Sequence, residues 1–193
     1  AIHSRAGIPN NKMLTSDEAE KLKSINWSEI ANKTMQTLNY ILNKYNNVKI
    51  TYKTKTGFES EQLKLINHEN SIRLVNGGSG HSLLREANVV IGFNSSAVYE
   101  ALAANKIIII PLFSEHIDEL SSDFILPLID GVYYPKSIEE FITILTKILN
   151  QNKYPSSLSA NLSLNQKNAL QEWFGNPDGK SSVRFADFIE KTI

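Results

Sequence analysis

Short apolar runs alternate with helical patterns along the middle of the chain. Two of these runs are continuous, as expected for strands buried on both faces, and the others combine β-forming residues with nearby turn residues. The five predicted strands cover residues 48–54, 71–75, 88–93, 106–111 and 132–134. Strands that alternate with helices are typical of βαβ units. The pattern therefore predicts an α/β fold with a doubly wound parallel sheet. A first strand that ends before His3 would belong to the same sheet.

Two helices carry clear start signals and a stripe of apolar residues at helical spacing. Asn26 and Glu29 have the spacing of a capping box, and so do Ser137 and Glu140. Shorter helices are predicted at 79–87 and 95–104, and two more near the C-terminus at 163–174 and 181–191. We expect residues 1–150 to form one domain. Residues 151–193 would form a linker and C-terminal helices, packed on this domain or on an N-terminal domain that the chain does not contain.

Composition narrows the class of protein. The 193 residues carry 20 basic and 20 acidic side chains, so no overall charge points to nucleic acid as a partner. The absence of cysteine excludes a disulfide framework and a thiolate nucleophile. No secretory signal is evident, and the apolar stretch at 107–113 is too short to span a bilayer. We expect a cytoplasmic protein with at most peripheral association with the inner face of the cytoplasmic membrane.

The strongest candidate site follows the strand at 88–93. The residues Asn94, Ser95 and Ser96 lie where a helix begins, and free backbone N–H groups there favour a phosphate. Glu100 comes about one turn later and is suited to accept hydrogen bonds from a ribose diol. The plain alternative, in which Ser95 is an N-cap and Glu100 is a solvated carboxylate, has equal weight on these residues alone.

This segment resembles the donor-binding region of GT-B-fold glycosyltransferases, and more narrowly those of bacterial capsule and surface-polysaccharide synthesis. The resemblance is carried by the strand at 88–92, the run Asn94-Ser95-Ser96, the segment 99–106 and the strand at 107–111. Three further segments are similar to such enzymes, at 3–9, 47–53 and 176–184. The likeness extends over nearly the whole chain, but only the Ser-Ser…Glu core is fairly specific. It implies the Rossmann-like, C-terminal half of a GT-B fold.

The resemblance implies phosphate contacts for Ser95 and Ser96 and a ribose contact for Glu100. Many relatives also have a Lys-Pro-His-Pro run after the second strand, whereas this chain has Lys53-Thr54-Lys55, which keeps a cation and loses the histidine. Lys53 is thus a candidate for neutralising the leaving phosphate, with a solvated strand end as the equal alternative.

Other candidates follow from their positions after strands. Arg5 is a phosphate candidate by position alone, and Gly78 with Ser79 would let the backbone turn close to a nucleobase or simply end a strand. Glu115 and His116 follow the strand at 106–111, and in GT-B enzymes the corresponding loop often lies near the donor sugar. A metal site at these residues is disfavoured. His81 is expected to be a surface histidine, with a ligand role the less favoured alternative.

The predicted function is transfer of a sugar from a CMP-, UDP-, GDP- or dTDP-linked donor to a bacterial surface polysaccharide or lipopolysaccharide acceptor. No cofactor is expected, since the nucleotide sugar is a substrate, and no catalytic residue can be assigned. Because an N-terminal acceptor domain does not fit in this length, we expect the chain to bind donor and to be inactive alone. Two alternatives remain open: a nucleotide-sugar epimerase or hydrolase of the same fold, and a non-catalytic nucleotide-binding module.

Overall fold

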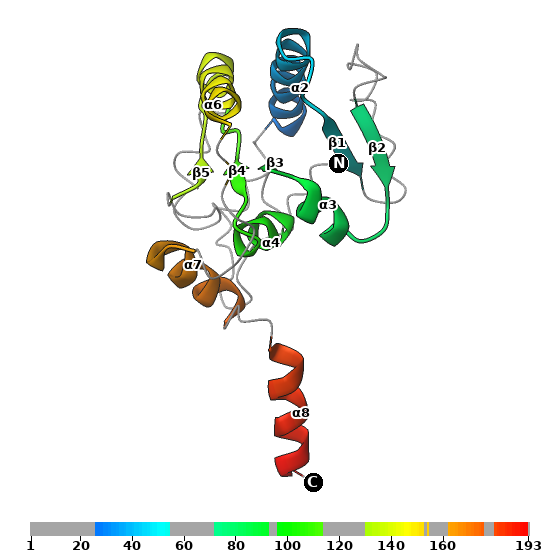
Figure 1. The fold of residues 1–193 in the computed structure, drawn as a ribbon, viewed down its shortest axis with the longest axis vertical. Helices are drawn as coiled ribbons and strands as arrows, with labels where there is room; N and C mark the ends of the chain where they lie inside the picture. Colours follow the sequence, from blue (N-terminus) through cyan, green and yellow to red (C-terminus); the bar gives the residue numbers. More distant parts are fainter. Residues whose placement is uncertain are drawn as a thin grey trace.

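The computed structural model describes residues 26–54, 72–92, 96–113, 130–152, 154, 162–175 and 180–192. Strands and helices alternate through most of this range (Figure 1). In chain order the elements are α2 (Trp27–Lys44), β1 (Ile50–Thr54), β2 (Ile72–Asn76), α3 (His81–Glu86), β3 (Val89–Ile91), α4 (Ser96–Ala103), β4 (Ile107–Ile109), β5 (Val132–Tyr133), α6 (Ile138–Gln151), α7 (Leu164–Phe174) and α8 (Ser181–Thr192). The predicted α/β class is confirmed.

The strands form two sheets, and every described pairing is parallel. β1 pairs with β2 over its full length, with Ile50 opposite Ile72. The second sheet has the order β3-β4-β5, in which Val89 lies opposite Ile107 and Ile108 lies opposite Val132. Parallel pairing requires a crossover between the paired strands, and α4 lies within the crossover from β3 to β4, whereas α3 connects β2 to β3, which belong to different sheets. All carboxyl ends within a sheet therefore lie at one edge.

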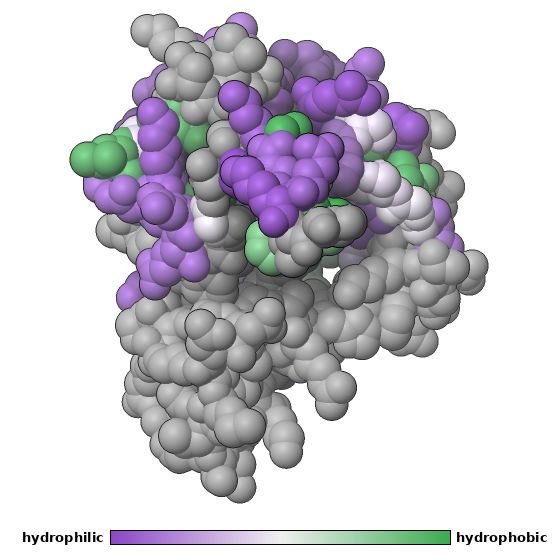
Figure 2. All heavy atoms as spheres, turned by 90° about the horizontal axis from the view of Figure 1, so that it is seen from below, coloured by the Kyte–Doolittle hydropathy of each residue, from purple (hydrophilic) through white to green (hydrophobic). Residues whose placement is uncertain are grey.

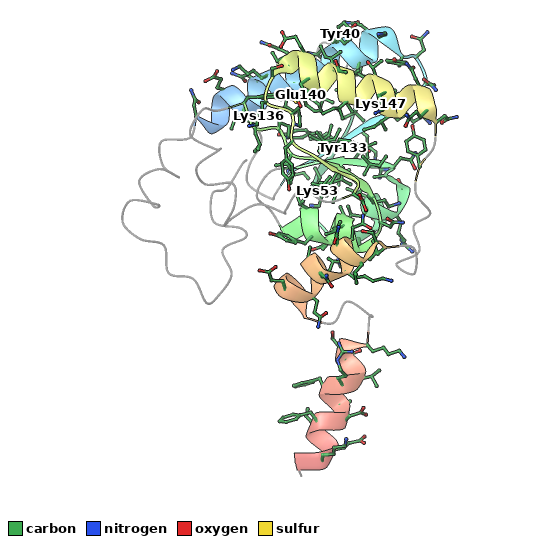
Figure 3. All side chains as sticks on the ribbon, turned by 90° about the vertical axis from the view of Figure 1, so that its left-hand side faces the viewer. Tyr40, Lys53, Tyr133, Lys136, Glu140 and Lys147 are labelled. Atoms are coloured by element: carbon green, nitrogen blue, oxygen red, sulfur yellow. The ribbon has the colours of Figure 1, made fainter. Side chains whose placement is uncertain are left out.

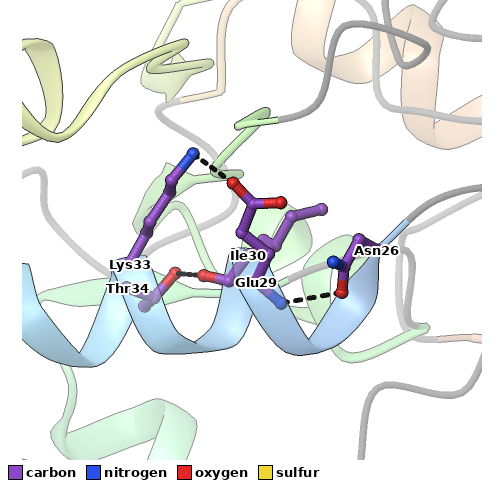
Figure 4. Close-up of polar contacts among 5 residues, drawn as sticks. All are labelled: Asn26, Glu29, Ile30, Lys33 and Thr34. Carbon is purple, nitrogen blue, oxygen red and sulfur yellow. Dashed lines mark hydrogen bonds and ion pairs between the residues drawn. The ribbon is translucent and has the colours of Figure 1, made fainter.

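Helix α2 begins where the sequence predicted, but its capping differs in one contact. The Asn26 side chain accepts a hydrogen bond from the Glu29 N–H at 3.1 Å, as a cap should (Figure 4). The Glu29 carboxylate pairs with Lys33 at 2.6 Å, one turn further along. An ammonium group four residues ahead competes with the cap N–H for this carboxylate.

The apolar stripe of α2 is buried, and its polar members are satisfied within the helix. Met35, Leu38 and Ile41 belong to the main core. Thr34 and Thr37 are also buried, and their hydroxyls donate to the carbonyls one turn earlier, to Ile30 at 2.8 Å and to Lys33 at 3.1 Å. These bonds allow the hydroxyls to lie in an apolar interface without loss of hydrogen bonding.

Helix α6 packs beside α2, and together they cover one side of the strands (Figure 1). Ser137 caps α6 by accepting from the Glu140 N–H at 3.2 Å. The Glu140 carboxylate accepts from the Lys136 N–H at 2.7 Å, one residue before the predicted partner. Phe141 is fully buried, and its ring lies 6.0 Å from that of Phe113, which joins α6 to the end of β4.

The centre of the core is β4 and the residues after it. Ile107, Ile108 and Ile109 are all buried, as predicted for a strand covered on both faces. β3 differs, because its three residues are only partly buried. Helix α4 packs against both strands from the side opposite α2 and α6 (Figure 1). Asn105 ends this helix with φ of 53°, a left-handed conformation that asparagine tolerates better than most residues.

Helix α7 packs against α4, and α8 extends away along the long axis of the molecule (Figure 1). Ala169 and Leu170 of α7 are buried, whereas Val183, Phe185 and Phe188 of α8 are each more than half exposed. Seen from below, most of the described surface is hydrophilic, with hydrophobic residues in small separate spots (Figure 2). Within the described ranges, no helix combines the length and the apolar character needed to cross a bilayer.

Candidate functional site

A loop of glycines after β2 lies at the carboxyl edge of the β1–β2 sheet. Gly77 and Gly78 both have positive φ, 69° and 68°. A side chain at Gly78 would meet no atom within 4 Å, so conformation and not space makes glycine favourable there. The loop turns the chain sharply from β2 into α3, and this confirms the expected backbone turn after the strand.

Lys53 reaches this loop from the neighbouring strand. Its Nζ donates to the Gly77 carbonyl at 3.0 Å. Its aliphatic stem passes Gly80, where a Cβ would lie 3.7 Å from the Lys53 Cε. In Figure 3 the label of Lys53 lies at the level of the strands. The helices α2 and α6 are above it, and α4 is below it. The only cation predicted on β1 for phosphate binding therefore lies directly against the glycine loop.

His81 begins α3 immediately after the loop and contacts α4. Its Nε2 lies 3.4 Å from Oε2 of Glu100. The His81 backbone N–H is bound by the Ser79 hydroxyl oxygen at 3.2 Å, which starts α3 two residues later than predicted. Ser79 thus binds the first residue of α3, and the Glu100 side chain, 39% exposed, contacts the same residue.

A close approach between β3 and α4 fixes where α4 begins. A Cβ on Gly92 would lie 2.7 Å from Cγ2 of Val98, closer than real Cβ contacts allow. The Gly92 N–H also donates to the Ile109 carbonyl at 3.1 Å, so the residue continues the sheet hydrogen bonding past the end of β3. The missing side chain therefore brings the first turn of α4 onto the carboxyl end of the sheet.

Buried phenols hold α4 against the rest of the molecule. Tyr99, next to Glu100, is 3% exposed, and burial raises its pKa well above the ordinary value, with the Glu172 carboxylate adding to the rise. Burial likewise raises the pKa of Tyr134, and Tyr99 contributes to it. Both phenols therefore stay neutral at physiological pH.

The predicted site residues divide into two groups. Four of them lie in or near the glycine loop: Gly78 and Ser79 belong to it, Lys53 binds its Gly77 carbonyl, and Glu100 contacts His81, the residue that follows it. Ser96 begins α4, at the helix end nearest β3, but its side chain is outside the described part of the structure. Five further candidates also lie outside the described residues: Arg5, Asn94, Ser95, Glu115 and His116.

The sequence alone did not predict the contact between His81 and Glu100. The two residues lie on different helices, and their approach depends on how tightly the loop turns and on how α4 packs. The position of His81 could have marked it as a candidate site residue, because it directly follows a glycine loop at the edge where ligands of parallel sheets bind.

The arrangement has the chemistry of an anion and hydroxyl site. An ammonium group on β1 binds the Gly77 carbonyl of the loop, and a carboxylate on α4 contacts His81 directly after the loop. The cation suits phosphate, the carboxylate suits a diol, and the glycine backbone admits a flat group closely. Among the described residues, no three His, Cys, Asp or Glu side chains gather as a metal site. A scan against protein-family models and a search of curated proteins gave no match.

Proposed function

We propose that the chain is the donor-binding part of a glycosyltransferase and holds the nucleotide of a nucleotide sugar at the glycine loop. The observation that carries the proposal is the 77–80 loop at the carboxyl edge of parallel strands, with Lys53 bound to the Gly77 carbonyl and Glu100 in contact with His81. Ligands of open α/β sheets bind at this edge. The resemblance to GT-B enzymes of surface-polysaccharide synthesis supports the choice of ligand.

The order of the strands supports a doubly wound sheet as the finer fold. In that order the first strand lies in the middle, with the second and third on one side and the next three on the other. β1-β2 and β3-β4-β5 match the two outer groups. We propose that the two sheets are parts of one doubly wound sheet.

In this proposal each group has one part in binding. Lys53 Nζ exchanges the Gly77 carbonyl for a phosphate oxygen, a stronger, charge-assisted partner. The α4 N-terminus adds backbone N–H donors at the same edge. Glu100 accepts from the ribose hydroxyls. Transfer to an acceptor would require a second domain, so the chain alone binds donor without turnover.

A nucleotide panel tests the proposal. Melting followed by far-UV circular dichroism, with CMP, UDP, GDP and dTDP in turn, should show stabilisation by at least one of them. A ligand at about 100 times its dissociation constant adds roughly 2.7 kcal/mol to the free energy of unfolding. No stabilisation by any member of the panel would overturn the nucleotide-site proposal.

Glu100→Gln tests the ribose contact. The amide keeps the size of the side chain but loses the charge and one strong acceptor, so affinity for the ribonucleotide that binds best should fall by about tenfold or more. Affinity for pyrophosphate should change by less than about twofold, because it carries no ribose. Isothermal titration calorimetry measures both ligands.

Glu190→Gln on the exposed helix α8 makes the same change of charge far from the loop and serves as the matched control. It should leave both affinities unchanged. Equal losses for the ribonucleotide and for pyrophosphate in Glu100→Gln would contradict a ribose contact.

A further inference from the structure

The geometry points to His81 as a positioning residue for Glu100, one that orients the carboxylate for the ribose of the bound nucleotide. This inference rests on the proposed function. His81 is the one histidine within the described ranges. It projects from the first turn of α3 toward Oε2 of Glu100, at 3.4 Å.

The pairing engages one oxygen of the carboxylate. An ionised carboxylate has two oxygens with about four acceptor positions. An N–H donor at Oε2 restrains the side chain and leaves Oε1 and the remaining positions of Oε2 for ribose hydroxyls. Nε2 carries the proton for this contact in the imidazolium and in the neutral tautomer that is protonated at Nε2.

The backbone around His81 is held in place from both sides. Ser79 Oγ binds the His81 N–H at 3.2 Å, and the Leu84 N–H closes the first helical bond to Gly80 at 2.9 Å. The Lys53 ammonium binds the preceding Gly77 carbonyl. A single turn thus connects the phosphate cation to the partner of the ribose carboxylate, so His81 holds Glu100 in register with Lys53.

The exposure of the pair sets the size of the effect. The His81 side chain is 77% exposed and that of Glu100 is 39% exposed, so water competes for the contact. Ion pairs that are exposed to this degree contribute only a modest interaction free energy. Removing the imidazole should therefore weaken binding by about two- to fivefold and leave the fold intact.

A competing role makes the opposite prediction. If His81 only occupied the acceptor that ribose needs, the nucleotide would have to displace it. His81→Ala would then tighten ribonucleotide binding. The direction of the change in affinity separates positioning from competition.

The experiment measures dissociation constants of the ribonucleotide from the panel that stabilises most, and of pyrophosphate as a probe without ribose. His81→Ala should weaken the ribonucleotide by about two- to fivefold and leave pyrophosphate unchanged. His81→Gln, whose amide N–H₂ reaches as far as Nε2, should recover most of the loss. In the Glu100→Gln background, His81→Ala should have no further effect, because the two residues act through one contact.

Several results would overturn the inference. Tighter or unchanged ribonucleotide binding in His81→Ala excludes a positioning role and leaves the nucleotide site itself standing. Equal weakening of pyrophosphate would mean that the histidine merely maintains the loop, and so would failure of His81→Gln to recover affinity. Absence of any nucleotide binding by the parent chain would remove the proposed function together with this inference.

Discussion

The contact between Gly92 and Val98 decides how closely the end of β3 approaches α4. Gly92→Ala should lower the free energy of unfolding by about 1–3 kcal/mol, because the new methyl group would lie 2.7 Å from Val98 Cγ2 and one of the two must move. Chemical denaturation followed by circular dichroism measures the loss.

Gly80→Ala is the matched control, since its Cβ would meet Lys53 carbons at an ordinary 3.7 Å. We expect its effect to be smaller by at least about 1 kcal/mol. Val98→Ala removes the clashing methyl but also buried apolar volume, so the loss in the double variant should be smaller than the sum of the two single losses. Equal losses in the two glycine variants would show that the close approach does not carry the effect.

Single residues also show what local sequence does and does not determine. The caps formed by Asn26 and Ser137 were predicted, because a cap depends on residues within one turn. The second half of each capping box was wrong, since the Glu29 carboxylate binds Lys33 and the Glu140 carboxylate binds the Lys136 N–H. When several donors lie within reach of a carboxylate, the local geometry decides which one it binds. The sequence spacing of a capping box does not determine this geometry.

Among the elements, α7 depends on one buried amide. Gln166 Oε1 accepts from the Ser163 N–H at 2.8 Å, and its Nε2 donates to the Asp130 carbonyl at 2.8 Å. Ser163 Oγ in turn accepts from the Gln166 N–H, which completes a reciprocal capping box. The side chain therefore starts α7 and attaches it to the turn before β5.

Gln166→Ala should lower the free energy of unfolding by about 1–3 kcal/mol, since the substitution leaves the Asp130 carbonyl and the Ser163 N–H without their partner. Urea denaturation measures the change. Gln171→Ala, at an exposed position of the same helix, is the control and should be near neutral because alanine favours helix. A loss in Gln171→Ala as large as in Gln166→Ala would contradict the proposed attachment.

Helices α6 and α8 show where element prediction from sequence reaches its limit. Both have apolar residues at helical spacing, and both were predicted as helices. In α6 the residues Phe141, Leu145 and Ile148 are buried, whereas in α8 Phe185 and Phe188 are exposed. Periodicity shows that a helix has an apolar face but does not identify the surface that covers it.

At the scale of the whole molecule, the proposed doubly wound sheet makes a prediction about backbone protection. Gly92 donates its N–H toward β4, so alternation along the strand directs the N–H groups of Val89 and Ile91 to the other side. If the two sheets are parts of one sheet in which β3 is not an edge strand, these two amides should exchange with solvent deuterium as slowly as those of Val90 and Gly92. Amide exchange followed by NMR measures all four. Fast exchange at Val89 and Ile91 alone would indicate two separate sheets.

The order of the elements was predictable because each strand has its own apolar signal. The location of the candidate site could be predicted in outline, since the topology brings the ends of parallel strands to one edge, where Lys53 binds the glycine loop. The contact of His81 with Glu100 was not predictable. It depends on two successive positive φ angles and on the approach of Gly92 to Val98, which are properties of tertiary packing.

The all-parallel pairing of the described strands also has a kinetic consequence. β4 receives one partner from earlier in the chain and the other from later, through Val89 with Ile107 and Ile108 with Val132. Neither pairing can form by a local hairpin, and non-local pairing slows folding. During synthesis the three isoleucines of β4 emerge before β5. Until β5 is made, the backbone groups on that edge of β4 have no pairing strand. We expect this interval to be the stage at which the nascent chain is most prone to aggregate.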